Sequence, residues 1–262
     1  MWKSIKAYLI DRDGVLVKSP GCVSIPGAKI WIQKVVKKNS PFLIASNHTL
    51  SSPEKAAQDL INAGFEINSE QVFTPLSALS KLFQMQNPGR VFVWGTAHLE
   101  EFVRQLNIQT VNDSSANTIL MGFCRKTDCR IMSLMIKAIV KNKATLLALH
   151  KNRLFADDQN NIEPGLGAWV SAIEYATGVE ARIIGKPNPE YFKTALQMLK
   201  AKAKETVMIS DDPTSDLCGA KQLGIKTVFV LSGKYPDTQI LNQIEPELRP
   251  DIILDSIKNV PI

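Results

Sequence analysis

The sequence contains no long hydrophobic run and few cysteines. No apolar stretch approaches the roughly 18–20 residues of a membrane-spanning helix. Residues 1–6 lead into only a four-residue apolar run, which is too short for a signal peptide. We therefore expect a cytoplasmic protein that has no membrane partner. The four cysteines, Cys22, Cys124, Cys129 and Cys218, show neither zinc-site spacing nor a disulfide framework, which favours reduced thiols.

Strong charge and low-complexity segments are also missing. The 262 residues carry a formal net charge of +6, which suits a small anionic substrate, but Lys and Arg are spread along the chain. The densest basic cluster, Lys34, Lys37 and Lys38, lies in an expected helix, where a solvated face is a simpler interpretation than a nucleic-acid patch. The composition, 45% hydrophobic and 21% charged, is that of an ordinary globular protein. No nucleic-acid partner is expected.

What the sequence does have is a set of short apolar runs that end in residues able to handle phosphate or magnesium. Residues 7–10 are followed by Asp11–Arg12–Asp13–Gly14, residues 41–45 by Ser46–Asn47, and residues 206–209 by Ser210–Asp211–Asp212. Short apolar runs that alternate with helical patterns indicate buried parallel strands. An open α/β sheet binds its ligands beyond the carboxyl ends of such strands. If the three strands are neighbours, the acids and the hydroxyl converge on one phosphate site.

The alternation of strand and helix patterns predicts the fold. We expect strands at 5–10, 41–46, 90–94, 118–122, 145–149, 181–184, 206–210 and 226–231. We expect helices at 26–39, 53–64, 96–106, 129–142, 166–177, 189–200 and 214–223. This is the βαβ rhythm of a doubly wound, mostly parallel, Rossmann-like sheet.

The middle of the chain has strands and helices of its own. We therefore expect a core domain over residues 1–78 and 181–262, with an inserted α/β cap domain at 79–180. The exit of the cap, residues 152–167, is polar and contains Gly and Pro, and it is expected to be a long loop.

Phosphoryl transfer requires a nucleophile, an acid/base, a cation and donors for the phosphoryl oxygens. One carboxylate of the Asp11 and Asp13 pair can attack phosphorus, and the other can protonate the leaving oxygen and later activate water. Asp11, Asp211 and the backbone carbonyl of Asp13 can hold Mg²⁺. Ser46 can donate to the phosphoryl group, and Lys186 can balance the carboxylates.

Each piece has a simpler structural interpretation when taken alone. Asp13–Gly14 is compatible with a tight turn, in which Gly14 brings the backbone close to a ligand or merely turns it. Asp211–Asp212 before Pro213 can cap a helix. Ser46 can end a strand, and Lys186 can be a surface residue. Their order along the chain and their place at separate strand ends favour the functional interpretation.

These motifs resemble the four signature motifs of the haloacid dehalogenase (HAD) superfamily. The matching residues are Asp11–Arg12–Asp13–Gly14–Val15, Ser46–Asn47, Lys186, and Asp211 with Asp216. The resemblance covers nearly the whole chain and is closest to subclass IIA, the NagD-like and nitrophenylphosphatase-like phosphatases, which carry a C2-type cap after the second motif. The stretches 148–153 and 164–187 are also similar to that subclass.

The resemblance implies roles for these residues. It makes Asp11 the nucleophile, Asp13 the acid/base and Lys186 a group that steadies the phosphoryl group. The remaining implied roles are phosphoryl binding by Ser46 and Asn47, magnesium binding by Asp11, Asp13 and Asp211, and support from Asp212 and Asp216. Arg12, His48 and Ser210 depart from the residues that are common at their positions, but none of these changes removes a catalytic group.

The histidines and the expected cap residues leave alternatives open. His48 borders the phosphate loop and either reaches the substrate or is structural. His150, with Asn152 and Arg153, follows a cap strand, where it either lines a specificity surface or is a loop histidine satisfied by the backbone. We interpret His98 as an ordinary helix residue.

The resemblance predicts a Mg²⁺-dependent phosphomonoester hydrolase that acts on small phosphorylated metabolites, such as a sugar phosphate or a nucleoside monophosphate, through an aspartyl phosphate. The first alternative is a non-catalytic phosphate-binding or interaction protein. A receiver-type signalling domain is a second alternative, which Asp13 and the large insertion argue against. Relatives often pair through the cap, so a homodimer through the cap is also expected.

Overall fold

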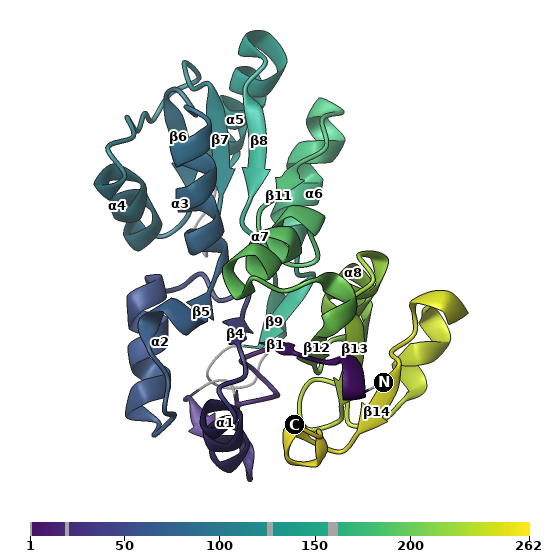
Figure 1. Ribbon diagram of the computed structural model, residues 1–262. Helices are drawn as coiled ribbons and strands as arrows, with labels where there is room; N and C mark the ends of the chain where they lie inside the picture. The colour runs from purple at the N-terminus through teal and green to yellow at the C-terminus, as the bar shows by residue number, and fades with distance from the viewer. Residues whose placement is uncertain (1, 19–20, 125–127, 157–161) are drawn as a thin grey trace. The chain divides into compact units, whose positions relative to one another are not determined.

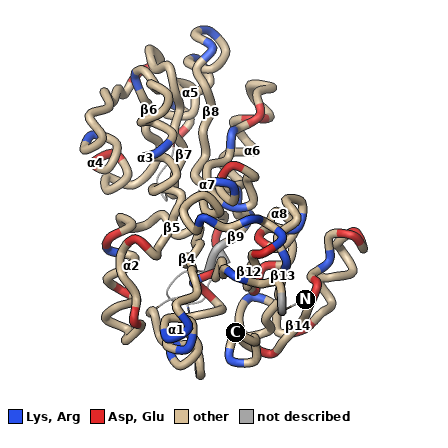
Figure 2. Tube along the Cα trace, viewed as in Figure 1, with Lys and Arg blue, Asp and Glu red and all other residues tan. Residues whose placement is uncertain are grey.

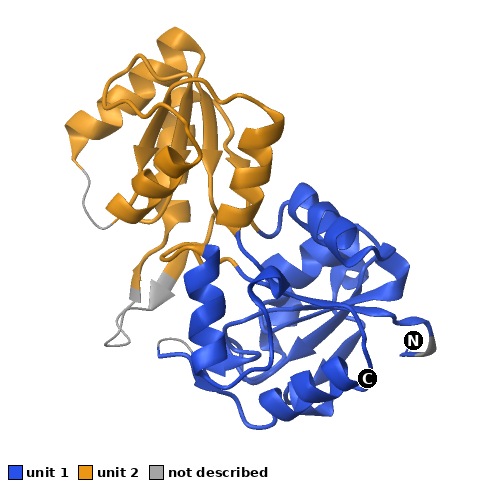
Figure 3. Cartoon of the chain, turned by 60° about the vertical axis from the view of Figure 1, so that its left-hand side comes forward, with its two compact units in different colours: residues 1–46, 53–74, 186–262 blue, residues 47–52, 75–185 orange. Residues whose placement is uncertain are grey.

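The computed structural model describes residues 2–18, 21–124, 128–156 and 162–262. The chain forms two compact units (Figure 3). The first unit comprises residues 1–46, 53–74 and 186–262, and the second comprises residues 47–52 and 75–185. Each unit contains its own parallel sheet with helices packed on it, which confirms the predicted α/β fold class.

The first unit is built on a six-stranded parallel sheet in the order β14-β13-β12-β1-β4-β5 (Figure 1). The strands are β1 (Ala7–Ile10), β4 (Phe42–Ala45), β5 (Val72–Phe73), β12 (Thr206–Ser210), β13 (Lys226–Val230) and β14 (Ile252–Leu254). Ile10, the last residue of β1, lies beside Ile209 of β12 and Ile44 of β4. The three strands that the sequence predicted to carry the site are therefore neighbours, and their carboxyl ends lie together.

Helices cover this sheet because their apolar residues recur at helical spacing. The helices of the first unit are α1 (Ala28–Lys37), α2 (Pro53–Asn62), α7 (Pro189–Leu199) and α8 (Cys218–Gln222). In α1, residues 28, 31, 32 and 35 are buried, which is one face of a 3.6-residue period. Trp31 packs edge-on against Tyr8 of β1, with ring centroids 5.3 Å apart. Short 3₁₀ turns lie at Trp2–Ser4, Ser69–Gln71, Ala203–Glu205, Gln239–Gln243, Pro246–Leu248 and Ile257–Asn259.

The second unit is built on a four-stranded parallel sheet in the order β11-β8-β7-β6. Its strands are β6 (Val91–Trp94), β7 (Thr118–Met121), β8 (Thr145–Ala148) and β11 (Arg182–Ile183). Its helices are α3 (Pro75–Met85), α4 (Ala97–Gln105), α5 (Cys129–Asn142) and α6 (Leu166–Thr177). One apolar cluster joins all four helices to this sheet, so the second unit has a core of its own.

Several short elements differ from the sequence-based expectations. The strand expected at 181–184 was placed in the core, but β11 pairs with β8 and so belongs to the second unit's sheet. The region 152–167, expected to be a long loop, contains β9 (Leu154–Ala156) and β10 (Ile162–Pro164), which pair antiparallel; its residues 157–161 lie outside the described residues. A short hairpin of β2 (Val17–Lys18) and β3 (Val23–Ser24) follows β1. Such short strands carry too few residues for a period to be recognised.

Charge and hydropathy in the structure agree with the interpretation of an ordinary globular chain. Lys and Arg are distributed along the trace together with Asp and Glu (Figure 2). Among the described residues, every helix is too short or too polar to cross a lipid bilayer. The cytoplasmic location stays a prediction.

Candidate active site

The loop after β1 carries the two acids of the first motif. The backbone N–H of Asp11 donates to the Ile209 carbonyl (2.8 Å). This hydrogen bond continues the β1–β12 ladder and fixes the position of the Asp11 backbone. Gly14 has a φ of +75°, a left-handed conformation that glycine adopts without strain. A Cβ at this position would overlap Oδ2 of Asp211, so the glycine also allows the two loops to touch.

Lys186 connects the first motif to the last. Its Nζ lies 2.7 Å from Oδ1 of Asp11 and 2.6 Å from Oδ2 of Asp216, and only 2% of its side chain is exposed. Burial by itself lowers the pKa of a lysine, but the two carboxylates outweigh it and raise the pKa of Lys186. A buried cation with two anionic partners is a satisfied ion cluster rather than a surface lysine.

Asp216 is held from two sides. Besides Lys186, the hydroxyl of Ser210 donates to its Oδ2 (2.8 Å), and the same hydroxyl accepts from the backbone N–H of Asp212 (3.1 Å). Burial raises the pKa of Asp216 to about 7 even though Lys186 opposes the shift. Ser210, at the last position of β12, therefore ties the strand end to the Asp216 carboxylate.

Asp212 caps the segment that follows β12. Its Oδ1 accepts from the backbone N–H groups of Thr214 (3.1 Å) and Ser215 (3.0 Å), at the start of a π-helical turn over Pro213–Leu217. We predicted a regular helix over 214–223. The π turn comes first, and α8 begins only at Cys218. π turns occur often at functional sites, and this one carries Asp216 toward Lys186.

Asp211 lies between two glycine-containing loops. Its Oδ2 accepts from the backbone N–H of Lys234 (2.6 Å), and a Cβ on Gly233 would overlap this oxygen, as a Cβ on Gly14 would. Burial, followed by the charge of Asp11, raises the pKa of Asp211 to about 8. Burial likewise raises the pKa of Asp11, against the effect of Lys186. Two carboxylates therefore repel each other in a desolvated position.

This donor set fits Mg²⁺. Asp11 and Asp211 present hard oxygens, and a divalent cation between them would offset the repulsion that raises the pKa of Asp211. Within the described ranges, no three His, Cys, Asp or Glu side chains converge as a metal cluster. The backbone carbonyl of Asp13 and water would therefore have to complete the coordination. That pattern is usual for Mg²⁺, which keeps several waters.

Ser46 directly follows β4 and is almost fully buried. Its backbone N–H donates to the Phe73 carbonyl (3.1 Å), and the Tyr191 hydroxyl donates to the carbonyls of Phe73 (2.6 Å) and Ser46 (3.2 Å). Tyr191 thereby holds the backbone at the ends of β4 and β5 in place. Tyr191 belongs to none of the motifs that predict the site. Its only signal was an aromatic residue in the first turn of the helix that begins at Pro189.

The structure adds Lys234 to the predicted residues. Its Nζ pairs with Oδ2 of Asp212 (2.8 Å) while its backbone donates to Asp211, so one residue contacts both consecutive acids. Burial raises the pKa of Asp212, but the ion pair with Lys234 and the hydrogen bonds from Thr214 and Ser215 together outweigh it and lower the pKa. Lys234 follows the carboxyl end of β13, and the rule that selected Asp11 and Asp211 would have found it.

The other predicted binding residues belong to the second unit. His48 bonds to Ser51 through Nε2 (2.9 Å). His150 is nearly buried, and its Nδ1 accepts from the Asn152 backbone N–H (3.4 Å). Asn152 and Arg153 are exposed. Their contact with a substrate, like that of Asn47, stays a prediction.

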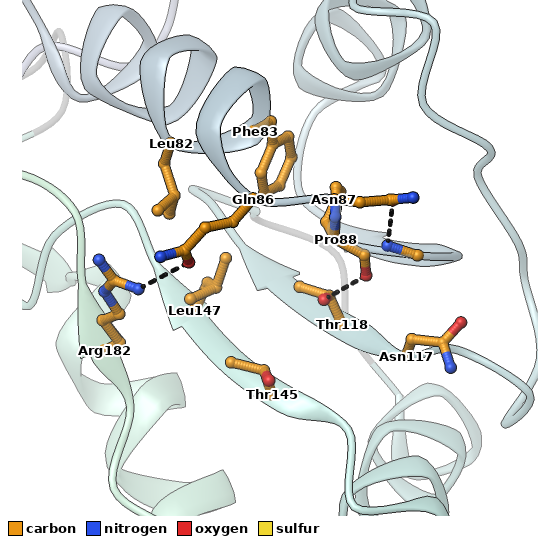
Figure 4. Close-up of a pocket in the computed structure, with 11 residues that line it drawn as sticks. Leu82, Phe83, Gln86, Asn87, Pro88, Asn117, Thr118, Thr145, Leu147 and Arg182 are labelled. Atoms are coloured by element: carbon orange, nitrogen blue, oxygen red, sulfur yellow. Dashed lines mark hydrogen bonds between the residues drawn. The ribbon is translucent and has the colours of Figure 1, made fainter.

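An open cavity of about 530 Å³ lies at the surface of the second unit, and Figure 4 shows the residues that line it. It is bounded by the end of α3 and by Thr118, Thr145 and Arg182, the first residues of β7, β8 and β11. Oε1 of Gln86 accepts from the Arg182 guanidinium across it (3.5 Å). His150 follows the opposite, carboxyl end of β8, so this cavity is not the expected specificity surface.

Comparison with known proteins assigns the family. Two family models match: "Haloacid dehalogenase-like hydrolase" over residues 8–109 and "HAD-hyrolase-like" over residues 183–260. A phospholysine phosphohistidine inorganic pyrophosphate phosphatase from Xenopus laevis is 28% identical, with 97% of this chain and 91% of the relative covered. A dihydroxyacetone phosphatase from Corynebacterium glutamicum is 27% identical, with 97% of this chain and 90% of the relative covered.

Solved structures agree with this assignment. The p-nitrophenyl phosphatase from Archaeoglobus fulgidus superposes with a TM-score of 0.86 at 25% identity, covering 97% of both chains. NagD from E. coli K-12 superposes with a TM-score of 0.85 at 23% identity, covering 98% of both chains, and this likeness shows the fold. The predicted NagD-like resemblance is thereby confirmed. The chain belongs to the haloacid dehalogenase-like hydrolases.

Proposed function

We propose that this HAD-type phosphatase is a Mg²⁺-dependent phosphomonoester hydrolase that works through an aspartyl phosphate on Asp11. The observation that carries the proposal is the buried lysine: Nζ of Lys186 bridges Asp11 and Asp216 at distances of 2.7 and 2.6 Å, beside the strand end that holds Asp211. Burying a lysine to 2% exposure is costly unless anionic partners compensate its charge. Here it restrains the attacking carboxylate.

The chain's own groups supply each step. An oxygen of Asp11 attacks phosphorus, the ester P–O bond breaks, and the leaving oxygen takes a proton from Asp13. Water then attacks the phosphorus of the aspartyl phosphate, Asp13 takes its proton, and the Asp11 O–P bond breaks to release phosphate. Ser46 and Asn47 donate to the phosphoryl oxygens. When bound by Asp11, Asp211 and the Asp13 carbonyl, Mg²⁺ supplies charge stabilisation for those oxygens.

The substrate is a small phosphorylated metabolite. Relatives of this chain are a dihydroxyacetone phosphatase and an acid sugar phosphatase from Staphylococcus aureus. We propose that the second unit acts as a cap that excludes water and selects the leaving group, with His150, Asn152 and Arg153 as its specificity residues. Pairing of two copies through this unit remains part of the same proposal.

The direct test is hydrolysis of p-nitrophenyl phosphate with and without chelator. We expect turnover that disappears with EDTA and returns with Mg²⁺, because Asp11 and Asp211 offer hard oxygen ligands. A folded protein that binds inorganic phosphate without any turnover would instead support the non-catalytic alternative. A panel of triose, sugar and nucleoside phosphates, ranked by kcat/KM, then identifies the substrate.

A further inference from the structure

Arg12 is a buried arginine with no assigned task. It stands between Asp11 and Asp13 in the sequence, yet it is only 7% exposed, whereas the side chain of Asp13 is 37% exposed. Burying a guanidinium is unfavourable unless its donors are used. The contacts of Arg12 therefore indicate why the position holds an arginine.

The main partner of Arg12 is Asp13. Nη1 donates to both carboxylate oxygens of Asp13, at 2.9 Å to Oδ1 and 3.2 Å to Oδ2. Among the described residues, Arg12 is the only side chain that hydrogen-bonds this carboxylate. The guanidinium also interacts with the Cys22 thiol, and Cys22 in turn donates to the Asp59 carbonyl of α2 (3.6 Å).

The backbone explains how neighbouring side chains can meet. In an extended strand, residues 12 and 13 would point to opposite faces. Here the N–H groups of Leu16 and Val17 both donate to the Arg12 carbonyl (2.9 and 3.1 Å), and the N–H of Gly14 donates to the Val17 carbonyl (2.8 Å). The loop curls at once after Asp11, so a fixed guanidinium lies beside the half-exposed Asp13.

The burial of Arg12 argues against a role in substrate binding. A guanidinium that bound the phosphoryl group would need to be reachable, but Arg12 is enclosed and its Nη1 is occupied by Asp13. Its Nε is buried and has no hydrogen-bond partner among the described residues, which is an uncommon feature in a folded protein. An unsatisfied donor is retained although an apolar residue of similar length would avoid it, which indicates a requirement for the Asp13 contact.

We propose that Arg12 is a positioning residue that holds the Asp13 carboxylate ready for proton transfer. This inference rests on the proposed function, in which Asp13 protonates the leaving oxygen and then takes the proton of the attacking water. Without Arg12, the exposed carboxylate would sample several rotamers and spend less time in the productive one. Arg12 itself touches neither substrate nor metal.

The test compares Arg12→Met, Arg12→Lys, Asp13→Asn and the Arg12→Met/Asp13→Asn double variant. Methionine has a similar length and no charge, so the buried side chain stays filled. We expect Arg12→Met to lower kcat about 10- to 100-fold, less than the roughly 10²- to 10⁴-fold loss for an absent acid/base. KM should change less than about two-fold, because the contact acts on the reacting geometry rather than on substrate binding. Arg12→Lys should restore part of the rate.

Two readouts separate positioning from a structural role. An alkyl phosphate needs a proton on its leaving oxygen, whereas p-nitrophenolate leaves readily as an anion. The kcat/KM loss of Arg12→Met should therefore be larger for the best alkyl phosphate of the panel than for p-nitrophenyl phosphate. In the Asp13→Asn background, Arg12→Met should change almost nothing. Arg104→Met, an exposed arginine on α4 paired with Glu100, is the matched control and should leave kcat unchanged.

The outcomes are distinct. Three results would each overturn the positioning role: an equal rate loss from Arg12→Met in the wild-type and Asp13→Asn backgrounds, an equal loss for both leaving groups, or a higher KM at unchanged kcat. Turnover by the wild type would still support the phosphatase. If Arg12→Met did not fold, Arg12→Lys, which keeps the positive charge, would take its place in the comparison with Asp13→Asn. A folded wild type without turnover on any panel substrate would overturn the proposed function itself.

Discussion

The two units share an architecture but carry opposite chemistry at the carboxyl ends of their strands. In the first unit, β1, β4 and β12 lead into Asp11, Ser46 and Asp211, which are buried, and the loop after Asp11 lies against the Asp211 carboxylate at Gly14. In the second unit, β6 and β7 lead into Gly95 and Gly122. The side chain of Leu99 packs so closely over both glycines that a Cβ on either would overlap it.

This difference shows that the parallel sheet alone does not make a site. The same edge carries buried acids with raised pKa values in one unit, whereas in the other unit the ends of β6 and β7 are covered by the apolar side chain of Leu99. Burial disfavours the charged form in both units, so it raises the pKa of Asp211 to about 8 and lowers that of His150 to about 4. Function follows from the residues placed on the fold rather than from the fold itself.

The largest expected effect is the loss of phosphatase turnover when the nucleophile of the first unit is replaced. Asp11→Asn should lower phosphatase turnover by at least about 10³-fold, because an amide cannot attack phosphorus. The fold should survive, since Lys186 keeps its ion pair with Asp216. Turnover of p-nitrophenyl phosphate, with circular dichroism as the check on folding, measures this. A rate within a few-fold of wild type would remove Asp11 from the nucleophile role.

The next effect tests the close contact around Asp211. Gly233→Ala places a Cβ against Oδ2 of Asp211 and against the Gly14 backbone, so the carboxylate must shift. Displacing the support of a metal ligand costs about 10- to 100-fold in metal affinity. Isothermal titration with Mg²⁺ in the absence of substrate should show that loss.

A second glycine provides the control for this prediction. Gly178, at the end of α6, has a φ of +68° and open space around it. Gly178→Ala should lower stability by about 1 kcal/mol through backbone strain and leave Mg²⁺ affinity unchanged. Equal Mg²⁺ affinities for Gly233→Ala and wild type would show that Asp211 does not need this contact.

Much of the first unit's site could be predicted because the ends of buried strands can be recognised in the sequence. Apolar runs place Asp11, Ser46 and Asp211 at neighbouring strand ends, and parallel pairing brings them together. Lys186 could be selected for its chemistry, but its contact with Asp11 spans 175 positions and depends on packing. No local period reports such a contact, so the Lys186–Asp216 bridge appears only in the structure.

What could not be predicted depends on short or irregular elements. The π turn that aims Asp216 and the two-residue strand β11 contain too few residues for periodicity to identify. The ion pair of Arg12 with the adjacent Asp13 depends on a loop that curls immediately, whereas a strand would have separated the two side chains. Tyr191 lies in a predicted helix and was missed because its hydroxyl bonds reach the backbone carbonyls of Ser46 and Phe73, 145 and 118 positions away in the sequence.

A smaller effect tests the buried histidine of the second unit. Burial lowers the pKa of His150 to about 4, below the value of about 6.5 for an unfolded chain. Above pH 6.5 both states are neutral and stability does not change. Between pH 6.5 and 4 the unfolded chain binds the proton and the folded one does not, so stability falls as pH falls. At pH 5 the loss is about 2 kcal/mol.

Urea unfolding at pH 7.5 and 5.0 checks this expectation. Carboxylates also titrate in this window, so the informative quantity is the difference between wild type and His150→Asn, which keeps an acceptor for the Asn152 N–H. The variant should lose about 2 kcal/mol less between the two pH values than wild type does. His98→Asn, at an exposed histidine of α4, should lose as much as wild type. Identical pH responses of all three proteins would contradict the buried neutral imidazole.

The smallest effect compares the two ends of the second unit's sheet. Arg153 follows the carboxyl end of β8, where we propose that the leaving group is selected, and Arg182 lines the cavity at the amino ends. Arg153→Ala should shift kcat/KM by about two- to ten-fold for some substrates and not for others, and so change their ranking, because a contact made equally in ground and transition states alters KM. Arg182→Ala should leave the ranking as in wild type. If Arg153→Ala lowers every substrate by one common factor, the residue supports folding or general chemistry, and selection by this surface is wrong.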